Sequence, residues 1–516
     1  MGNFNNTVGS VSLQSGSITG TGGTLASTTT FGVESGTVSA NLGGSVGLTK
    51  TTGSTVTLSG ANTYTGATIV SAGTLQVNST LASTTYTLDG GSLVIGASNF
   101  LPNNSAVLLT GGTLVMGNFN NTVGSVTLLT GSITGTGGTL TSTTDFDMQS
   151  GTVSAILGGG GGLRKSTSST VTLSAANTYT GVTSVVAGTL QVNNTLASAS
   201  YSLDFGGLVI GASNLLPNNS AVNLTGGTLA LGNFNNTVGS VRLGSGSITG
   251  TGGTLTSTTD FELWNGSVSA ILSGGVGLSK SVGTTVTLSA ANSYSGNTTV
   301  SQGILALSGS GSFASSPTIA VGYGTKLDVK GVTGGANHDG THFALVSGQT
   351  LHGNGIVIGA MDVGAGATIA PGDSIGTLGV SDLSLTSATA VVKLEIDFGV
   401  TPDADLLDVT GGITLANSTL DLSLLNLSPT SVPETFLVVA NDLSDAVTET
   451  FGTITGVPNG YIATVDYAFT GADALGRIGD GNDIAVTVNQ IVPEPSTWTM
   501  LGLGLPALLG LRRFRR

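Results

Sequence analysis

The sequence of 516 residues contains no cysteine, and only 8% of its residues are charged and 5% aromatic. Without cysteine the fold has neither disulfide bonds nor thiolate metal ligands, so packing alone must stabilise it. Low charge is not typical of intrinsic disorder, and the 83 glycines show no collagen-like period of three. Small turn residues together with Val, Leu, Ile and Thr predict an all-β fold.

Positive charge is scarce in one part of the chain. Residues 1–330 carry 8 acidic and 7 basic side chains, whereas residues 331–491 carry 18 acidic and 2 basic ones. The net charge of the whole chain is −14. Such a body repels nucleic acid and anionic lipid, so we expect no nucleic-acid partner.

A long internal repeat organises the first three hundred residues. The phrase MGNFNNTVGSV at residues 1–11 recurs at residues 116–126 and, with Leu in place of Met, at residues 231–241. Asn62, Asn177 and Asn292 keep the same spacing of 115 residues. The third copy departs from the repeat near Gln302. One unit of the fold is therefore expected to recur every 115 residues.

Within each copy, apolar and polar residues alternate in short runs that end at Gly-Gly, Ala-Gly or Asn-Asn. This pattern predicts short strands that face one core. A unit of 115 residues is too long for one solenoid coil, so we expect about five coils of roughly 20 to 25 residues in each copy. Stacked coils share a continuous core and lie about 4.8 Å apart.

Two stretches resemble a known family. ANTYTGATIVSAGTLQVNSTLA at residues 61–82, with its copies, resembles the autotransporter-associated β-strand repeat, and residues 351–385, including PGDSIGTL, resemble the C-terminal part of passengers that carry this repeat. The resemblance covers most of residues 1–490. It implies an exported, passenger-type surface protein with an all-β, right-handed parallel β-helix, or β-solenoid, built from 115-residue repeats.

The expected organisation has six parts. These are copy 1 at 1–116, copy 2 at 117–231, partial copy 3 at 232–310, a passenger-like end of the β-helix at 311–390, an acidic terminal β region at 391–491, and a tail at 492–516. Residues 1–30 show no secretion signal, so we expect that an internal methionine equivalent to Met116 stands at the start of a truncated copy. The alternative is an intracellular solenoid that begins at Met1.

The tail combines an apolar segment with a basic end. Residues 497–511 are mostly apolar. As a helix they would reach about 22 Å, against roughly 30 Å of hydrocarbon, so we expect a short transmembrane helix of marginal length. A helix docked on the protein surface is the alternative. The predicted anchor residues are Trp498, Leu501, Leu505, Leu508 and Leu511, and the predicted cytoplasmic end holds Arg512, Arg513, Arg515 and Arg516.

With the motif Pro493, Glu494 and Pro495, this tail resembles a PEP-CTERM sorting signal. The resemblance implies a Gram-negative envelope and recognition by an exosortase in the inner membrane. It also implies transient anchoring there, removal of the tail, and delivery to the cell surface or the extracellular matrix.

Ser374 lies in GDSIG, which fits the G-x-S-x-G pattern of serine hydrolases. In that fold the catalytic histidine follows the serine, but no histidine follows His352 in this chain. We therefore interpret GDSIG as a turn between coils.

The three histidines are His338, His342 and His352. A spacing of four on a strand would place His338 and His342 on one face beside Asp339, an arrangement that suits a weak zinc or copper site. Polar loop residues are the favoured interpretation, and we predict no metal site here.

Carboxylates recur in the repeat. Asp145 and Asp147 correspond to Asp260 and Glu262, while copy 1 has Thr30 and Gly32 at these positions. Members of each pair share a strand face, but a pair that is absent from one copy is typical of a solvated surface. In the acidic region, Asp403, Asp405 and Asp408, or Asp480 and Asp483, could bind calcium loosely, although ordinary acidic turns are favoured.

The sequence therefore predicts a non-enzymatic surface or matrix protein, without catalytic residues or cofactors, that acts in adhesion, biofilm structure or association with exopolysaccharide or neighbouring surface proteins. Two alternatives stay open. One is a polysaccharide-active enzyme on the same scaffold, which requires carboxylates clustered in a groove. The other is a passive stalk for a domain upstream of Met1.

Overall fold

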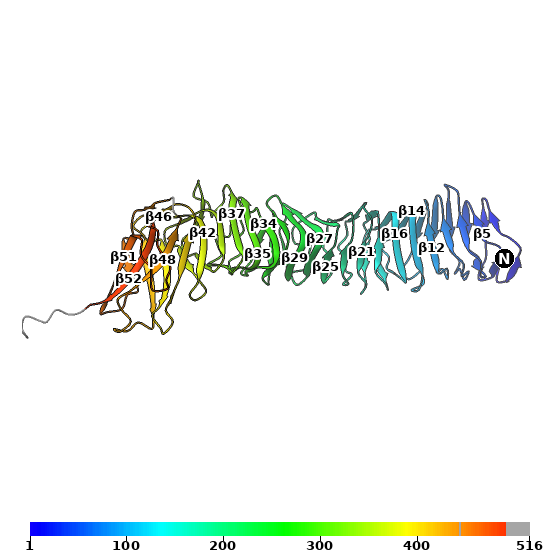
Figure 1. Ribbon diagram of the computed structural model, residues 1–516. Helices are drawn as coiled ribbons and strands as arrows, with labels where there is room; N and C mark the ends of the chain where they lie inside the picture. The colour runs from blue at the N-terminus through cyan, green and yellow to red at the C-terminus, as the bar shows by residue number, and fades with distance from the viewer. Residues whose placement is uncertain (443–444, 492–516) are drawn as a thin grey trace, which may run out of the picture. The chain divides into compact units, whose positions relative to one another are not determined.

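The computed structural model describes residues 1–442 and 445–491, and these residues form strands and turns without a helix (Figure 1). The all-β prediction is confirmed, and the chain winds into a parallel β-solenoid of about 19 turns. Residues 492–516 lie outside the described residues, and so do the predicted sorting motif, membrane anchor and arginine cluster. Among the described residues, no helix is long and apolar enough to cross a membrane.

The chain divides into two compact units. The first contains residues 1–317 and 331–336, and the second contains residues 318–330 and the described part of 337–516. In the first unit two long ladders of parallel strands run from coil to coil, and Figure 1 shows their strands in succession. Each coil contributes to each ladder either one short strand or one half of a longer strand, and the backbone of an inner strand bonds to the coils on either side.

The first ladder consists of strands that pair in chain order. They are β2 (Ser12–Leu13), β5 (Phe31–Val33), β8 (Leu48–Lys50), β10 (Thr68–Val70), β12 (Thr85–Leu88), β14 (Ala106–Gly117), β16 (Ser125–Gly135), β18 (Phe146–Met148), β21 (Leu163–Lys165), β23 (Thr183–Val185), β25 (Ser200–Leu203), β27 (Ala221–Gly232), β29 (Ser240–Gly250), β31 (Phe261–Leu263), β34 (Leu278–Leu288) and β35 (Thr298–Gly309).

The second ladder uses the later halves of β14, β16, β27, β29, β34 and β35 together with separate short strands. Those strands are β3 (Ser17–Ile18), β6 (Gly36–Val38), β9 (Thr55–Leu58), β11 (Thr74–Val77), β13 (Ser92–Ile95), β19 (Gly151–Val153), β22 (Thr170–Leu173), β24 (Thr189–Val192), β26 (Gly207–Ile210) and β32 (Gly266–Val268).

A third side of the coils carries one three-stranded parallel sheet in each copy. The sheets are β1 (Asn6–Val8), β4 (Thr24–Ser27) and β7 (Asn41–Gly43); β15 (Asn121–Val123), β17 (Thr139–Ser142) and β20 (Ile156–Gly158); and β28 (Asn236–Val238), β30 (Thr254–Ser257) and β33 (Ile271–Ser273).

Each copy of the repeat makes six coils, so the expectation of about five longer coils is wrong. The coils are counted from buried residues that pair in the first ladder; through one copy these are Phe31, Leu48, Thr68, Tyr86, Val107, Val126 and Phe146. The separate short strands have only two to four residues. Average strand lengths of about five to six residues therefore overestimate the length of a coil.

Some coils approach so closely that only glycine fits. Gly151 has a φ of 126°, and a Cβ atom built there would lie 2.2 Å from the carbonyl oxygen of Gly131. Gly266 repeats this arrangement against Gly246, at 2.1 Å. A side chain at these positions would push neighbouring coils apart, which explains part of the high glycine content.

A buried lysine occurs once in each copy. Lys50, Lys165 and Lys280 are fully buried at an inward position of the first ladder. The Lys165 ammonium donates to the carbonyl oxygens of Thr167 and Ala187 and to the hydroxyl of Thr167. Burial lowers the pKa of each of the three lysines. Each lysine thus satisfies carbonyl groups at a coil corner that would otherwise lack a donor.

The regularly spaced ANTYTG phrase also has a structural role. The Asn177 side chain accepts from the Leu157 amide at 2.9 Å and donates to the Ala175 carbonyl at 2.8 Å, which ties two coils together. The Tyr179 hydroxyl lies 2.9 Å from the Thr183 hydroxyl, and its ring lies 6.2 Å from that of Phe146. These buried polar groups of the core are therefore paired.

The second unit continues with parallel coils and ends in antiparallel strands. Its strands are β36 (Thr318–Val321), β37 (Lys326–Val332), β38 (Phe343–Leu345), β39 (Thr350–Gly353), β40 (Ile356–Val363), β41 (Thr368–Pro371), β42 (Thr377–Leu385), β43 (Val391–Asp397), β44 (Asp403–Ala404), β45 (Leu406–Val409), β46 (Ile413–Thr414), β47 (Thr419–Leu425), β48 (Glu434–Asn441), β49 (Val447–Thr448), β50 (Thr453–Thr455), β51 (Tyr461–Phe469) and β52 (Asp483–Gln490). Strand β52 pairs antiparallel with β48 and β51.

We expect the change Lys165→Ala to lower the free energy of unfolding by about 2–5 kcal/mol, because it empties buried volume and removes the donor to two carbonyl groups. Denaturant unfolding followed by circular dichroism measures this loss. The change Lys326→Ala at an exposed lysine is the control and should cost less than about 0.5 kcal/mol. Equal effects of the two changes would show that the buried ammonium does not stabilise the coil.

Candidate functional site

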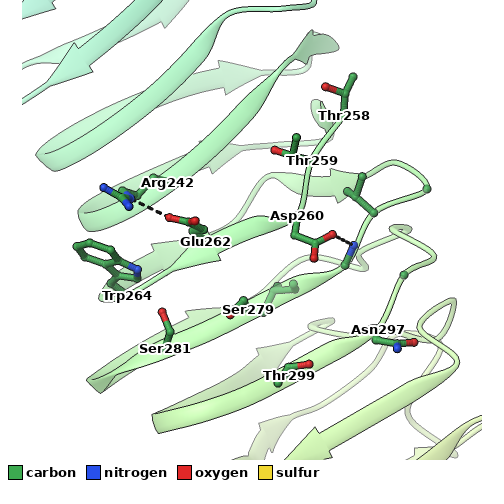
Figure 2. Close-up of a pocket in the computed structure, with 15 residues that line it drawn as sticks. Arg242, Thr258, Thr259, Asp260, Glu262, Trp264, Ser279, Ser281, Asn297 and Thr299 are labelled. Carbon is green, nitrogen blue, oxygen red and sulfur yellow. Dashed lines mark hydrogen bonds and ion pairs between the residues drawn. The ribbon is translucent and has the colours of Figure 1, made fainter.

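An open groove of about 1070 Å³ lies on the outward side of the first ladder in the third copy (Figure 2). Residues that pair on consecutive coils, namely Arg242, Glu262, Ser279 and Thr299, form one row along it. The groove is also lined by Thr258, Thr259, Asp260, Trp264, Ser281 and Asn297. Because outward positions alternate with buried ones along each strand, polar side chains collect here over the apolar core.

An ion pair and an aromatic ring form the centre of the groove. The Arg242 Nε atom donates to Glu262 Oε2 at 2.8 Å, and the guanidinium carbon lies 4.4 Å from the centroid of the Trp264 ring. Figure 2 shows these three side chains next to one another, with Arg242 on β29, Glu262 on β31 and Trp264 directly after β31. The side chains of Arg242 and Glu262 remain about half exposed, at 49% and 50%. The indole and the guanidinium therefore support each other while both stay partly open to solvent.

Asp260 has a structural partner within the groove. Its Oδ1 accepts from the Gly277 amide at 2.7 Å, and Asp145 accepts from the Gly162 amide at 2.6 Å in the second copy. The predicted carboxylate pair Asp260 and Glu262 does line one groove. However, one member caps a backbone amide and the other pairs with arginine, so both carboxylates are engaged.

The aromatic ring distinguishes the third copy from the other two. Gln149 and Glu34 occupy the position of Trp264 in copies 2 and 1, and Thr127 and Ser12 occupy that of Arg242.

The pairing of Arg242 with Trp264 was missed from the sequence, because a full coil separates the two residues along the chain. The sequence did contain an indication of this site. The chain has two tryptophans, and one of them, Trp264, replaces the polar residue that the other copies of the repeat have at this position.

This arrangement suits a carbohydrate. An indole face packs against the C–H face of a sugar ring, while guanidinium, carboxylate, hydroxyl and amide groups bond to its hydroxyl groups. The charged side chains of the groove are Arg242, Asp260 and Glu262, which together carry no excess of positive charge. Such a groove favours a neutral polysaccharide over a polyanion.

In the second unit, Ser374 lines a pocket with His352 and Asp373. His352 Nδ1 lies 2.8 Å from Asp373 Oδ1. The structure records no hydrogen bond from the Ser374 hydroxyl to this imidazole within the described residues, and a strand–helix elbow is absent there. His352, which precedes Ser374 in the sequence, is therefore a neighbour of GDSIG in the structure. The hydrogen bonds of a catalytic triad are nevertheless not formed.

The expectation that His338 and His342 share a strand face is wrong. Residues 339–342 form a turn before β38, and His338 Nδ1 accepts from the Gly340 amide at 3.1 Å. The turn is held by Asp339 Oδ1, which accepts from the Thr341 and His342 amides, each at 2.8 Å. The spacing of four therefore does not bring the two imidazoles together.

The acidic segments of the second unit are mostly structural. Asp405 is buried, and its two oxygens accept from the amides of Gly376 and Glu395 at 2.8 and 2.7 Å. Asp483 is also buried and accepts from the Asn441 amide at 2.8 Å. Asp403 and Asp408 are exposed. None of these residues belongs to a cluster of three metal-ligating side chains in the described part of the chain.

Comparison with known proteins agrees with the repeat. The family model Passenger-associated-transport-repeat matches residues 48–77, 163–192 and 283–307. The first two segments begin at β8 and β21, and the third runs from β34 into β35. The chain thus carries three segments similar to the passenger-type repeat, as the resemblance of residues 61–82 implied.

A similar protein is the Adhesin BmaC autotransporter of Brucella suis biovar 1 (strain 1330). It is 30% identical over 320 residues, which cover 59% of this chain. The same stretch covers 8% of the relative, so the chain spans a small fraction of that protein's length. The solenoid is therefore similar to part of an autotransporter adhesin.

We expect the stability of the second unit to depend on pH through Asp405. Burial raises the pKa of this carboxyl group to about 7. Because folding raises the pKa above its unfolded value of about 3.9, the stabilisation is complete below that value and is lost as the pH rises through about 7. Denaturant unfolding measured from pH 4 to pH 8 should show this decline in the wild type.

In the variant Asp405→Asn the decline should be weaker, because the amide side chain does not titrate in this range. Asp408→Asn, at an exposed carboxylate on the next strand, is the matched control and should retain the wild-type slope. An unchanged slope in Asp405→Asn would contradict the assignment.

Proposed function

We propose that the chain is a non-enzymatic, exported adhesion protein of a Gram-negative bacterium, and that its solenoid holds extracellular polysaccharide in the groove around Trp264. The passenger-type repeats and the similarity to an autotransporter adhesin support a role at the cell surface. The observation that carries the proposal is the partly exposed Trp264–Arg242 pair in a groove lined with hydroxyl groups.

The architecture supports binding without catalysis. In the groove, Glu262 is held by Arg242, and Asp260 by the Gly277 amide. Acid and base catalysis of glycoside cleavage needs one carboxyl group that can donate a proton and another that is available to the sugar or to water. Because Glu262 and Asp260 already have partners, these carboxylates are better suited to accept hydrogen bonds from a bound sugar than to act as catalytic acid and base.

The change Trp264→Ala should weaken polysaccharide binding by about tenfold or more, because it removes the ring on which the sugar stacks. Soluble exopolysaccharide purified from the producing bacterium is the ligand. Trp264 and Trp498 are the two tryptophans of the chain, so the change Trp498→Phe leaves Trp264 as the sole tryptophan fluorophore for a titration. Isothermal titration calorimetry measures the loss in Trp264→Ala.

Gln149→Ala is the matched control, since Gln149 occupies the same position of the repeat in copy 2. Its affinity should equal that of the wild type. Equal affinity of Trp264→Ala and the wild type would place the sugar elsewhere. Release of new reducing ends during incubation would favour the polysaccharide-active enzyme, and complete absence of binding would favour a passive stalk.

We also propose that the tail sorts the protein to the cell surface or the biofilm matrix. Pro493, Glu494 and Pro495, the apolar stretch that follows them, and the terminal arginines match a signal read by an exosortase. The inner membrane would hold the tail only until it is removed. The support for this proposal is the sequence resemblance alone.

Replacement of Pro493, Glu494 and Pro495 by alanine should leave the tail uncleaved and the protein in the inner-membrane fraction of the producing cell. Mass spectrometry of the C-terminal peptide, with and without residues 512–516, measures the cleavage. The change Asp408→Ala, at an exposed residue of the solenoid, is the control and should be processed normally. Normal cleavage in the triple variant would exclude the motif as the recognition signal.

A further inference from the structure

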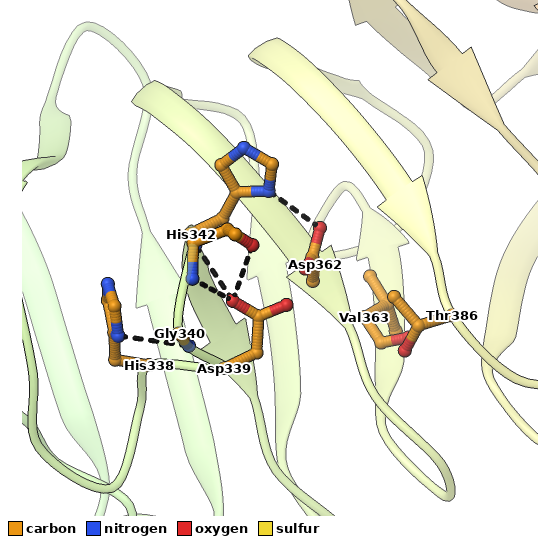
Figure 3. Close-up of polar contacts among 8 residues, drawn as sticks. His338, Asp339, Gly340, His342, Asp362, Val363 and Thr386 are labelled. Carbon is orange, nitrogen blue, oxygen red and sulfur yellow. Dashed lines mark hydrogen bonds and ion pairs between the residues drawn. The ribbon is translucent and has the colours of Figure 1, made fainter.

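A mixed cluster of nitrogen and oxygen donors lies in the second unit at the turn before β38. Asp339 and His342 belong to this turn, and Asp362 lies on β40, which pairs with β38 on the next coil. One ligand atom from each of the three side chains falls within 4.8 Å of the other two. Figure 3 shows the imidazole of His342 and the carboxyl groups of Asp339 and Asp362 converging, with His338 to one side.

Strand register brings Asp362 to this turn. Ala344 pairs with Asp362 across β38 and β40, so Asp362 lies next to the residues that lead into β38. Sequence pattern alone could not join Asp362 to the histidines, because a full coil separates it from His342 along the chain. The sequence pattern groups His338, Asp339 and His342. Asp339 and His342 belong to the cluster, whereas His338 does not.

The cluster carries an excess of negative charge, and one of its carboxylates is buried while Asp339 and His342 are exposed. Asp362 is 4% exposed, and its ion-pair partner among the described residues is His342. Two carboxylates that face each other beside an imidazole are stabilised when a cation lies between them.

One separation within the cluster fits a small divalent ion. His342 Nδ1 lies 3.4 Å from Asp362 Oδ1. In a tetrahedral zinc site with bonds of about 2.0–2.1 Å, two ligand atoms lie about 3.3 Å apart. An imidazole nitrogen with two carboxylate oxygens is a donor set for zinc, whereas calcium and magnesium prefer oxygen ligands alone.

The surroundings leave room for the remaining ligands. A pocket of about 360 Å³ is lined by His342, Asp362 and Asp382. Three protein ligands with one open position form a common zinc arrangement, in which water completes the coordination. Asp339 Oδ1 accepts hydrogen bonds from the amides of its own turn. These bonds orient the carboxylate toward Asp362, in the way that hydrogen bonds from outer-shell groups orient the ligands of a metal.

We propose that Asp339, His342 and Asp362 bind a divalent transition-metal cation, with Zn²⁺ as the ion that fits best. Bound in this way, the ion ties the turn at residues 339–342 to β40 on the following coil. The site is independent of the polysaccharide groove, since the two lie in different units of the chain and share no residue.

Titration of the full-length, tag-free protein with Zn²⁺ by isothermal titration calorimetry tests the proposal. We expect one ion per chain in the wild type. The changes His342→Ala and Asp362→Asn should each weaken binding about tenfold or more, because even the loss of an outer-shell partner costs roughly 10–100-fold. His338→Ala and His352→Ala are the matched controls and should bind as the wild type does.

A second readout guards against loss of structure in the variants. Asp339→Asn changes an exposed side chain at the surface, and it should also lower the affinity while circular dichroism stays unchanged. Co²⁺ added in place of Zn²⁺ should give visible absorption bands that His342→Ala alters and His338→Ala does not. Absence of binding by the wild type, or wild-type affinity in both His342→Ala and Asp362→Asn, would overturn the proposal and leave a plain His342–Asp362 ion pair.

Discussion

Hydrogen bonding between parallel strands of successive coils is the interaction on which the rest of the structure depends. Each short strand in the interior of the first unit bonds to the coil before it and to the coil after it, so none of these strands is stable alone. The coils differ in length, yet the inward residues stay in register along both ladders. Extra residues are therefore taken up at the corners, and the ladders stay regular.

The same constraint explains the polar groups of the interior. A corner of variable length leaves carbonyl groups that face inward, and a buried lysine in each copy provides the donors that these groups need. Asn62, Asn177 and Asn292 bond backbone groups of adjacent coils in a similar way. The polar positions that recur from copy to copy in the core are thus largely those that satisfy the backbone.

Much of the fold could be predicted from the sequence because it depends on local pattern. Alternation of apolar and polar residues predicts strands, and the exact recurrence of Asn62 at Asn177 predicts equivalent coils. The number of coils could not be predicted, since it depends on how few residues a corner needs. The periodicity of the sequence does not show where a coil corner lies, such as the one whose carbonyl groups accept hydrogen bonds from Lys50.

The candidate sites were harder to predict, because each depends on contacts between coils. Arg242 meets Trp264, and His342 meets Asp362, only after a full turn of the chain. At such a separation, the spacing of two residues in the sequence predicts a contact between them only when the length of a coil is known. Residues within one turn, such as Asp339 and His342, were correctly grouped as neighbours, but their relation to His338 was not.

The whole number of coils in each copy has a consequence for how the protein can change length. Because equivalent coils meet the same neighbours in every copy, removing or adding one whole copy joins strands that already match in register and in buried side chains. Such a step alters the length of the first unit by about 29 Å, at about 4.8 Å per coil, without creating a new junction. A gain or loss of whole copies would therefore change the length of the first unit in equal steps.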